Sequence, residues 1–400
     1  MSAALRNLCN ALHILTSIQE RPSQCSDAIL FQLNTWHEWD AARERHYREE
    51  KSRRIFDWVQ QTQIVCSFFG AHPPVLPDDP PYSPQEWAEL EKTARTMTTG
   101  FAAEDYLLDR IDTWLLECYT LPGLCEVEPG DTVLDCGTYS GNTSLYFAGK
   151  TGPEGRVYGF EASPRSFSVY SDNVRDHANI FPVNAAVCGH CGTATFAELG
   201  VGAHINTEGV TVPATTLDGF FAEKNLERVD FIKMDIEGAE ISALRGAETT
   251  IQRFTPKMAL SAYHKYSDLL AIPKCLEAIA PGRYTYRLRH FSPGLYETVL
   301  YCVPKERAVD EPLPPPETEP APPVTQGQLL LLAKESIKAF MRVVSYQDAS
   351  VTKHMELQSS LMEKLEEAEK CLKETTAENE RLQLENMALR SILEKRHSGK

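Results

Sequence analysis

Short apolar segments alternate with helical segments between residues 131 and 303, and this alternation limits the possible folds more than any other feature of the chain. The expected strands lie at 132–135, 156–161, 180–184, 231–235 and 257–262. Strands that alternate with helices build a parallel sheet whose two faces are covered by those helices. The chain is therefore predicted to be an α/β protein.

Two later segments add an antiparallel element to this sheet. Residues 284–290 and 296–303 face each other across Ser-Pro-Gly, a sequence typical of a hairpin. We therefore predict a mixed sheet that closes with an antiparallel hairpin. The segment 237–249, which follows the fourth strand, is expected to be a helix.

The flanking segments differ from this α/β region in composition. Clusters of proline, which fixes φ and lacks a backbone donor, separate structural units. The predicted units are a helical N-terminal region (1–70), a proline-rich linker (71–84), a helical lead-in (85–119), the α/β domain (120–304), a proline-rich acidic linker (305–326), and an amphipathic helix with a coiled coil (327–398).

The coiled coil is predicted from a heptad pattern over 361–393. Leucines recur at the a and d positions, and Asn379 and Asn386 also fall at a, which favours a two-stranded, in-register pairing. The expected partner is a second copy in a parallel homodimer, or a different chain. The alternative is a single amphipathic helix packed on the α/β domain, but the proline-rich linker before it argues against this.

Composition excludes several classes of protein. The formal net charge is −16, so phosphate backbones repel the chain and nucleic-acid binding is not expected. No apolar run is long enough to span a membrane, and the N-terminus lacks the features of a secretory signal. The 11 cysteines are scattered and odd in number, as in a reduced, cytoplasmic protein.

A glycine turn follows the first strand of the α/β region. Asp135, Gly137 and Gly141 form D-x-G-x-x-x-G, where the absence of Cβ atoms lets backbone amides approach a bound cofactor. A dinucleotide fingerprint would read G-x-G-x-x-G and bind a pyrophosphate. The carboxylate at this turn instead suits a cationic amino-acid head group. A purely structural turn is the alternative.

Two further acids end the second and fourth strands. Glu161 ends the second strand, where a carboxylate can accept hydrogen bonds from both hydroxyls of a ribose. Asp235 ends the fourth strand, at the edge where open α/β sheets bind ligands. Glu237 and Glu240 follow it in the first turn of the expected helix, where the helix dipole alone explains acids.

The ordered motifs resemble the FkbM-type family of S-adenosylmethionine-dependent methyltransferases over about residues 120–304. The matching pieces are EPGDTVLDCGTYSG (128–141), GFEASP (159–164), NAAVCGHCGTATF (184–196), TTLDGF (215–220), IKMDIEGAE (232–240), YHKYSDLLAIP (263–273) and RLRHFSPGLYETVLY (287–301). The resemblance implies a class I methyltransferase with a Rossmann-like fold. It also implies S-adenosyl-L-methionine as the cofactor and a hydroxyl on a sugar, glycan or natural product as the acceptor.

The resemblance also implies a role for each motif residue. Asp135, Gly137 and Gly141 would shape the methionine end of the cofactor site, and Glu161 would bind the ribose. The residues expected near the adenine are Asn184 and Ala185. Asp235 would face the reacting centre or the amino group of the cofactor. Cys136 and the pair Thr138-Tyr139 depart from the smaller residues that many relatives have at this turn.

Methyl transfer to oxygen mainly requires that the two reactants are aligned, and a base that takes the hydroxyl proton assists it. His264, which follows the fifth strand, is the first candidate for this base, and Asp235 is the competing one. His290 and Glu297 are candidates for the lining of the acceptor pocket, and pairing across the predicted hairpin is the alternative explanation for them. No metal is expected, because no second ligand pair completes the C-G-H-C segment at 188–191.

A different class of function is also open. The long N-terminal extension and the coiled coil would suit a catalytically inactive, methyltransferase-like scaffold that acts through its coiled coil. The three acids Asp135, Glu161 and Asp235 argue against a scaffold, since it would not need all of them.

Overall fold

The structure is a computed structural model that describes residue 7 and residues 27–69, 77–78, 80–97, 107–197, 204–205 and 209–307. The predicted amphipathic helix and coiled coil at 327–398 lie outside the described residues, as does most of the linker 305–326. Among the helices that are described, none combines the length and the apolar character that crossing a membrane requires.

The described residues of the α/β region form a seven-stranded sheet with the strand order β10-β11-β9-β8-β1-β2-β3. Strands β9, β8, β1, β2 and β3 run parallel, whereas β11 is antiparallel to both β9 and β10. The bounds are β1 (Thr132–Cys136), β2 (Arg156–Phe160), β3 (Ile180–Val183), β8 (Phe231–Met234), β9 (Lys257–Ser261), β10 (Tyr284–His290) and β11 (Thr298–Pro304). The predicted mixed sheet with a closing antiparallel hairpin is confirmed.

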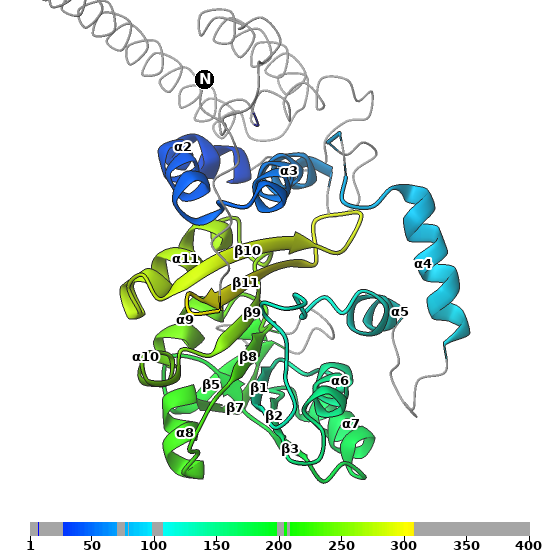
Figure 1. Ribbon diagram of the computed structural model, residues 1–400, viewed down its shortest axis with the longest axis vertical. Coiled ribbons are helices and arrows are strands. Elements are labelled where there is room, and N and C mark those ends of the chain that lie inside the picture. The colour runs from blue at the N-terminus through cyan, green and yellow to red at the C-terminus, as the bar shows by residue number, and fades with distance from the viewer. Residues whose placement is uncertain are drawn as a thin grey trace, which may run out of the picture.

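Helices cover both faces of this sheet (Figure 1). One face carries α6 (Asn142–Thr151) and α7 (Pro164–Val174), and the other carries α8 (Leu217–Lys224), α9 (Glu240–Arg245), α10 (Glu248–Phe254) and α11 (Asp268–Ile279). Within β1, Val133 belongs to one apolar cluster and Leu134 to the other, because successive side chains of a strand point to opposite faces. The strand is therefore buried along its whole length.

The segment after β8 differs from the predicted continuous helix over 237–249. Glu237 has a φ of 53°, which no helical residue adopts, so a turn precedes the helix. The carboxylate of Glu240 accepts hydrogen bonds from the backbone N–H groups of Ile236 (3.1 Å) and Gly238 (3.4 Å) and stabilises this turn. Helix α9 consequently begins at Glu240, and a break after Arg245 separates it from α10.

A smaller sheet lies beside the main one. Its strands are β4 (Ala186–Val187), β5 (Gly192–Ala197), β6 (His204–Ile205) and β7 (Val210–Thr215), in the order β4-β7-β5-β6. Strands β5 and β7 are antiparallel. The C-G-H-C segment forms the turn from β4 to β5, with Cys188 buried and Cys191 exposed.

The N-terminal helices α2 (Asp27–His46) and α3 (Glu50–Phe69) cover the outermost strand of the main sheet, β10 (Figure 1). Trp39, Tyr47 and Phe56 lie in the same apolar cluster as the sheet. The hydroxyl of Tyr47 donates a hydrogen bond of 2.6 Å to the carbonyl of Leu269 in α11. This part of the predicted N-terminal region is therefore helical, and it shares its core with the α/β domain.

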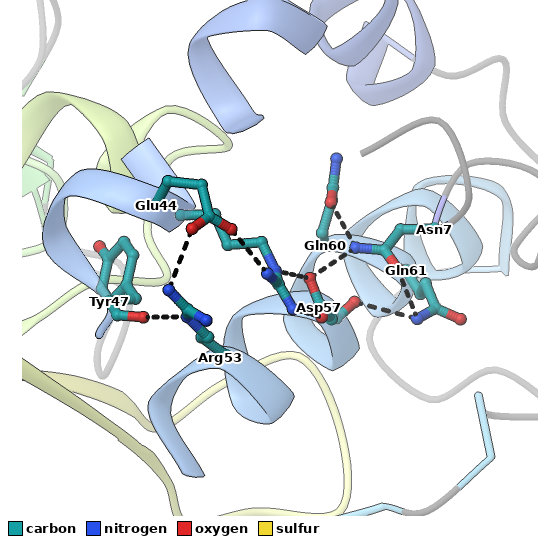
Figure 2. Close-up of polar contacts among 8 residues, drawn as sticks. Asn7, Glu44, Tyr47, Arg53, Asp57, Gln60 and Gln61 are labelled. Carbon is teal, nitrogen blue, oxygen red and sulfur yellow. Dashed lines mark hydrogen bonds and ion pairs between the residues drawn. The ribbon is translucent and has the colours of Figure 1, made fainter. Parts of the chain in front are cut away.

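Polar contacts hold α2 and α3 together (Figure 2). Arg43 donates two hydrogen bonds to the carboxylate of Asp57, at 2.9 and 2.8 Å, and Arg53 pairs with Glu44 at 3.0 Å. The side-chain amide of Asn7, which is buried, donates to the same Asp57 at 2.9 Å. These contacts link α2 to α3 and to Asn7.

The predicted helical lead-in contains α4 (Pro84–Thr96), α5 (Leu107–Asp109) and a π-helix, η1 (Arg110–Leu115). Helix α4 begins with a capping box between Ser83 and Glu86. The π-helix places one extra residue in each turn, a feature often found at functional sites. It packs against the N-terminal part of α6, because Trp114 donates a hydrogen bond of 3.0 Å to the side chain of Asn142.

Candidate functional site

A cavity of about 370 Å³ opens at the carboxyl ends of β1, β2 and β8. This is the edge at which open α/β sheets bind ligands. Phe160, Glu161 and Ala185 line one end, and residues of η1 and of the loops that follow β9 and precede β11 line the other. The cavity therefore has an apolar end near β2 and, as the following contacts show, an acidic end near β8.

The glycine turn forms the floor of this cavity. Gly137 has a φ of 84°, and a Cβ atom at this position would lie 1.8 Å from the backbone oxygen of Asp235. Gly141, with a φ of 95°, caps α6. Gly137 lines the cavity, as sequence predicted, whereas Gly141 supports the turn from behind, against Tyr170.

Asp135 lies beneath the cavity and does not line it. Its carboxylate is fully buried and accepts hydrogen bonds from Thr143 (2.8 Å) and Ser144 (2.7 Å). Lys233 Nζ lies 3.4 Å from the same group and also donates to the carbonyl of Gly137 at 2.5 Å. Asp135 therefore holds the turn and α6 in place, and any effect on a cofactor is transmitted through Gly137.

Glu161 faces the cavity from the end of β2, and only 8% of the residue is exposed. Its two carboxylate oxygens accept hydrogen bonds from the backbone N–H groups of Tyr139 (2.9 Å) and Ser163 (2.8 Å). Burial raises the pKa of Glu161 to about 7, against the effect of these hydrogen bonds. The carboxyl group is thus fixed in direction and easily changes its charge near neutral pH.

Of the two residues predicted to lie near an adenine, one lines the cavity and the other does not. Ala185 lines the cavity. The side chain of Asn184 points to the main chain instead, and donates to the carbonyls of Glu161 (2.8 Å) and Ala162 (3.3 Å). Asn184 therefore positions the Glu161 loop, and Ala185 forms part of the apolar wall.

Asp235 faces the acidic end of the cavity. Its carboxylate accepts hydrogen bonds from the hydroxyls of Tyr119 (2.8 Å) and Tyr263 (3.2 Å). Burial by itself would raise the pKa of Asp235, but the contact with His264 and the charge of Lys233 outweigh it and hold the pKa below its usual range. This carboxylate is therefore ionised.

His264 lies behind Asp235 and does not line the cavity. Its Nε2 atom is 3.3 Å from Asp235 and 3.5 Å from Glu237, and its Nδ1 atom is 2.9 Å from Glu240. Burial lowers the pKa of His264, but hydrogen bonding to Asp235 and Glu240 outweighs it and raises the value to about 11. An imidazolium in this state has no lone pair with which to accept a proton.

The hydroxyl of Tyr263, which donates to Asp235, also lies 3.4 Å from the carboxylate of Glu297. Burial, and then the neighbouring charge of Asp235, raise the pKa of Glu297 to about 8. His290 lies elsewhere, buried against Thr298 at 2.7 Å and outside the cavity lining. Of the two residues predicted for the acceptor pocket, Glu297 lines the cavity and His290 does not.

Sequence reasoning missed the contribution of the lead-in segment. Asp109 and Asp112 of α5 and η1 line the acidic end, and Tyr119 donates to Asp235. The available signal was two acids, three residues apart, in an otherwise apolar helical stretch. That spacing places both on one helical face, but nothing in the sequence shows that this face covers the glycine turn.

Known proteins resemble parts of this chain. The Aeropyrum pernix fibrillarin-like rRNA/tRNA 2'-O-methyltransferase is 43% identical over 65 residues, which is 16% of this chain and 28% of that protein. The solved structure of methyltransferase FkbM from Methylobacillus flagellatus KT has 20% identity and a TM-score of 0.48, covering 68% of this chain and 60% of that one. Aeropyrum pernix fibrillarin, solved with bound S-adenosyl-L-methionine, has 22% identity and a TM-score of 0.32, covering 47% of this chain and 74% of that one.

The chain thus spans less than two thirds of the length of the first two of these relatives. A family model gives a more direct comparison. The model of the methyltransferase FkbM domain matches residues 135–287, which include the glycine turn, Glu161 and Asp235. The predicted resemblance to this family is therefore confirmed for residues 135–287, which carry a methyltransferase FkbM domain.

Proposed function

We propose that the protein is an S-adenosylmethionine-dependent methyltransferase that methylates a hydroxyl group of a sugar, a glycan or a natural product. The observation that carries this proposal is the position of Glu161. Its buried carboxyl group faces a cavity of about 370 Å³, next to a glycine turn and an apolar wall. A nucleoside needs this combination, because its ribose hydroxyls donate hydrogen bonds while its base requires an apolar surface.

The cavity residues fit the cofactor along its length. Glu161 would bind the ribose, Ala185 and Phe160 would contact the adenine, and the turn at Gly137 would support the methionine portion. When bound, the cofactor supplies a methyl group on a sulfonium, which is already activated for transfer. The protein must then align the acceptor hydroxyl and accept its proton.

We assign the proton-accepting role to the carboxylates at the acidic end. Asp235, held by Tyr119 and Tyr263, would orient the acceptor hydroxyl. Glu297 would receive the proton in its ionised form, which a pKa of about 8 makes a stronger base than Asp235 and which becomes more populated as the pH rises through that value. His264 is the positive charge that keeps Asp235 ionised and in place, so we propose it as a positioning residue rather than the base.

Titration of S-adenosylhomocysteine into the full-length protein tests cofactor binding. We expect Glu161→Ala to weaken the affinity at least about tenfold, because two charge-assisted hydrogen bonds are lost. Glu154→Ala is the matched control, since Glu154 is an exposed acid before the same strand. Absence of binding by the folded wild-type protein would favour the scaffold alternative, in which the residues 361–393 carry the function.

The proposal also extends to the coiled coil predicted at 361–393 and to the location of the protein in the cell. Dimerisation or partner binding through 361–393 would place the enzyme on an assembly, and the reduced cysteines suit the cytoplasm. Deleting 325–400 should therefore abolish self-association in size-exclusion chromatography while the affinity for S-adenosylhomocysteine is retained. Loss of cofactor affinity in that truncation would contradict the independence of the two parts.

A further inference from the structure

The acidic end of the cavity carries more carboxyl groups than the proposed methyl transfer requires. Asp109, Asp112, Asp235, Glu237 and Glu297 all line it. Among the described lining residues, Lys233 has the one basic side chain. That lysine is 1% exposed and already engaged by Asp135 and the carbonyl of Gly137, so it does not offset these acids toward a ligand.

Asp112 is the member of this group with an unmet bonding requirement. The residue is 8% exposed, and its Oδ1 atom has no hydrogen-bond partner among the described residues. A buried carboxylate oxygen without a donor is costly, and a ligand that donates to it removes that cost. Asp112 lines the cavity. Burial, and then the charges of Glu297 and Asp109, raise the pKa of Asp112, so a cation bound beside it would favour the ionised carboxylate.

The spacing of the acids favours an organic cation over a metal ion. A divalent metal requires several ligand atoms that converge on one point. Among the described residues, the acid and histidine group that converges in this way consists of Glu240, His264 and Asp268. Asp112 and its neighbours in the cavity do not form such a group. Separate carboxylates suit a protonated amine, whose N–H groups can reach different acceptors.

We propose that the acceptor of this methyltransferase carries a protonated amino group, and that Asp112, assisted by Asp109, binds it. The inference rests on the proposed function, because it concerns the acceptor of that reaction. Asp235 and Glu297 remain with the reacting hydroxyl at the same end of the cavity. The acceptor class is therefore a hydroxylated amine, such as an amino sugar, and phosphorylated or carboxylated acceptors are repelled.

The cofactor itself also contains an ammonium group, and the experiment must separate the two sources. We would saturate the full-length protein with S-adenosylhomocysteine and measure binding of glucosamine, N-acetylglucosamine and glucose by calorimetry. These probes differ in the charge at one position. The wild-type complex should bind glucosamine about tenfold more tightly than either neutral sugar, the range expected for a charge-assisted hydrogen bond.

Asp112→Asn should abolish this preference, because an amide of almost the same shape cannot ionise to pair with the ammonium group. Its affinity for S-adenosylhomocysteine should stay within about twofold of the wild-type value, a change too small to represent a lost charged hydrogen bond. Asp172→Asn, at an exposed position of α7, is the control and should keep the preference. Circular dichroism of each variant would confirm that it is folded.

Several results would overturn the inference. Equal binding of the three sugars, or no binding of glucosamine, would exclude an ammonium site for the acceptor. An equal loss of S-adenosylhomocysteine affinity in Asp112→Asn would assign Asp112 to the cofactor. A preference that appears only with added Mg²⁺ would replace the amine with a metal. Failure of the wild-type protein to bind S-adenosylhomocysteine would remove the proposed function itself.

Discussion

Arg289, on the outermost strand of the sheet, donates two hydrogen bonds of 2.7 Å to Glu49, which lies between helices α2 and α3. The two residues are 240 positions apart in the chain. Ser52 reinforces the contact, since its hydroxyl accepts a hydrogen bond of 2.9 Å from the backbone N–H of Leu288. The N-terminal helices therefore protect an edge strand that would otherwise expose unpaired backbone groups.

Breaking this link should destabilise the whole catalytic unit. We expect Arg289→Ala to lower the free energy of unfolding by about 2 kcal/mol, the value typical of hydrogen bonds to charged groups. Glu49 also makes the stability depend on pH. Burial by itself would raise the pKa of Glu49, but its hydrogen bonds with Arg289 and Ser52 outweigh burial and lower it. Its stabilisation is present above the unfolded pKa and is lost as the pH falls through the folded value. Urea denaturation at pH 7 and pH 4 would measure both effects.

The control for this prediction is an exposed ion pair. Glu89 and Lys92 lie 3.2 Å apart in α4, with side chains 73% and 74% exposed. Lys92→Ala should change the stability by less than about 0.5 kcal/mol. An equal effect of both alanine substitutions would show that α2 and α3 do not depend on the Arg289 contact.

Gly137→Ala should damage the cofactor turn. The new Cβ atom would lie 1.8 Å from the backbone oxygen of Asp235, and the φ of 84° is unfavourable for alanine. We expect a loss of about 1–3 kcal/mol in stability together with lost S-adenosylhomocysteine binding. Gly149→Ala, in α6 with nothing within 4 Å of the new Cβ, should instead stabilise the protein by up to about 1 kcal/mol. Similar losses in both variants would contradict the role given to the turn.

His264 and His290 should differ in charge across the physiological range. Burial lowers the pKa of His290 to about 4, so its ring is neutral above pH 5. His264, with its pKa raised to about 11, should stay protonated up to pH 9. Imidazole nitrogen shifts in NMR spectra between pH 5.5 and 9 would check this. A titration of His264 near pH 6.5 would return it to the candidates for the general base.

His264→Gln should therefore lower the stability markedly. The substitution leaves the carboxylates of Asp235 and Glu240 without their shared cation, and breaking a buried pair costs about 3–5 kcal/mol. Because the folded pKa lies above the unfolded one, the stabilisation by His264 is fully present below about pH 6.5 and is lost as the pH rises through about 11. Denaturation curves of wild type and His264→Gln at pH 6 and pH 9 should differ most at pH 6.

Cofactor affinity should depend on pH through Glu161. Its pKa of about 7 means that the carboxyl group of the empty protein is protonated in mild acid, whereas the ionised form is the better acceptor for ribose hydroxyls. The dissociation constant of S-adenosylhomocysteine should increase about tenfold for each pH unit below 7, which is the linkage of one proton. Calorimetry from pH 5.5 to 8 would measure it. Glu161→Gln should bind weakly with little pH dependence, and an unchanged profile would point to another titrating group.

Local patterns were sufficient for the α/β domain because its strands are short, apolar and separated by glycine turns. The alternation over 131–303 and the Ser-Pro-Gly turn predicted a mixed sheet, and the ends of its strands predicted that Glu161 and Asp235 lie at the ligand edge, where both line the cavity. The helix expected over 237–249 begins later, because the positive φ of Glu237 and the contacts of Glu240 depend on packing. No residue spacing in the sequence reports that conformation.

The sequence alone thus determined the fold class, the family motifs and the set of acids at the ligand edge, because strand periodicity and turn chemistry are local properties. Only the tertiary structure decided what each side chain does. It brought Tyr119 and Asp112 to the cavity, placed Asp135 below it, and surrounded His264 with carboxylates. Burial and neighbouring charges set these roles, and both arise from residues that are far apart in the chain.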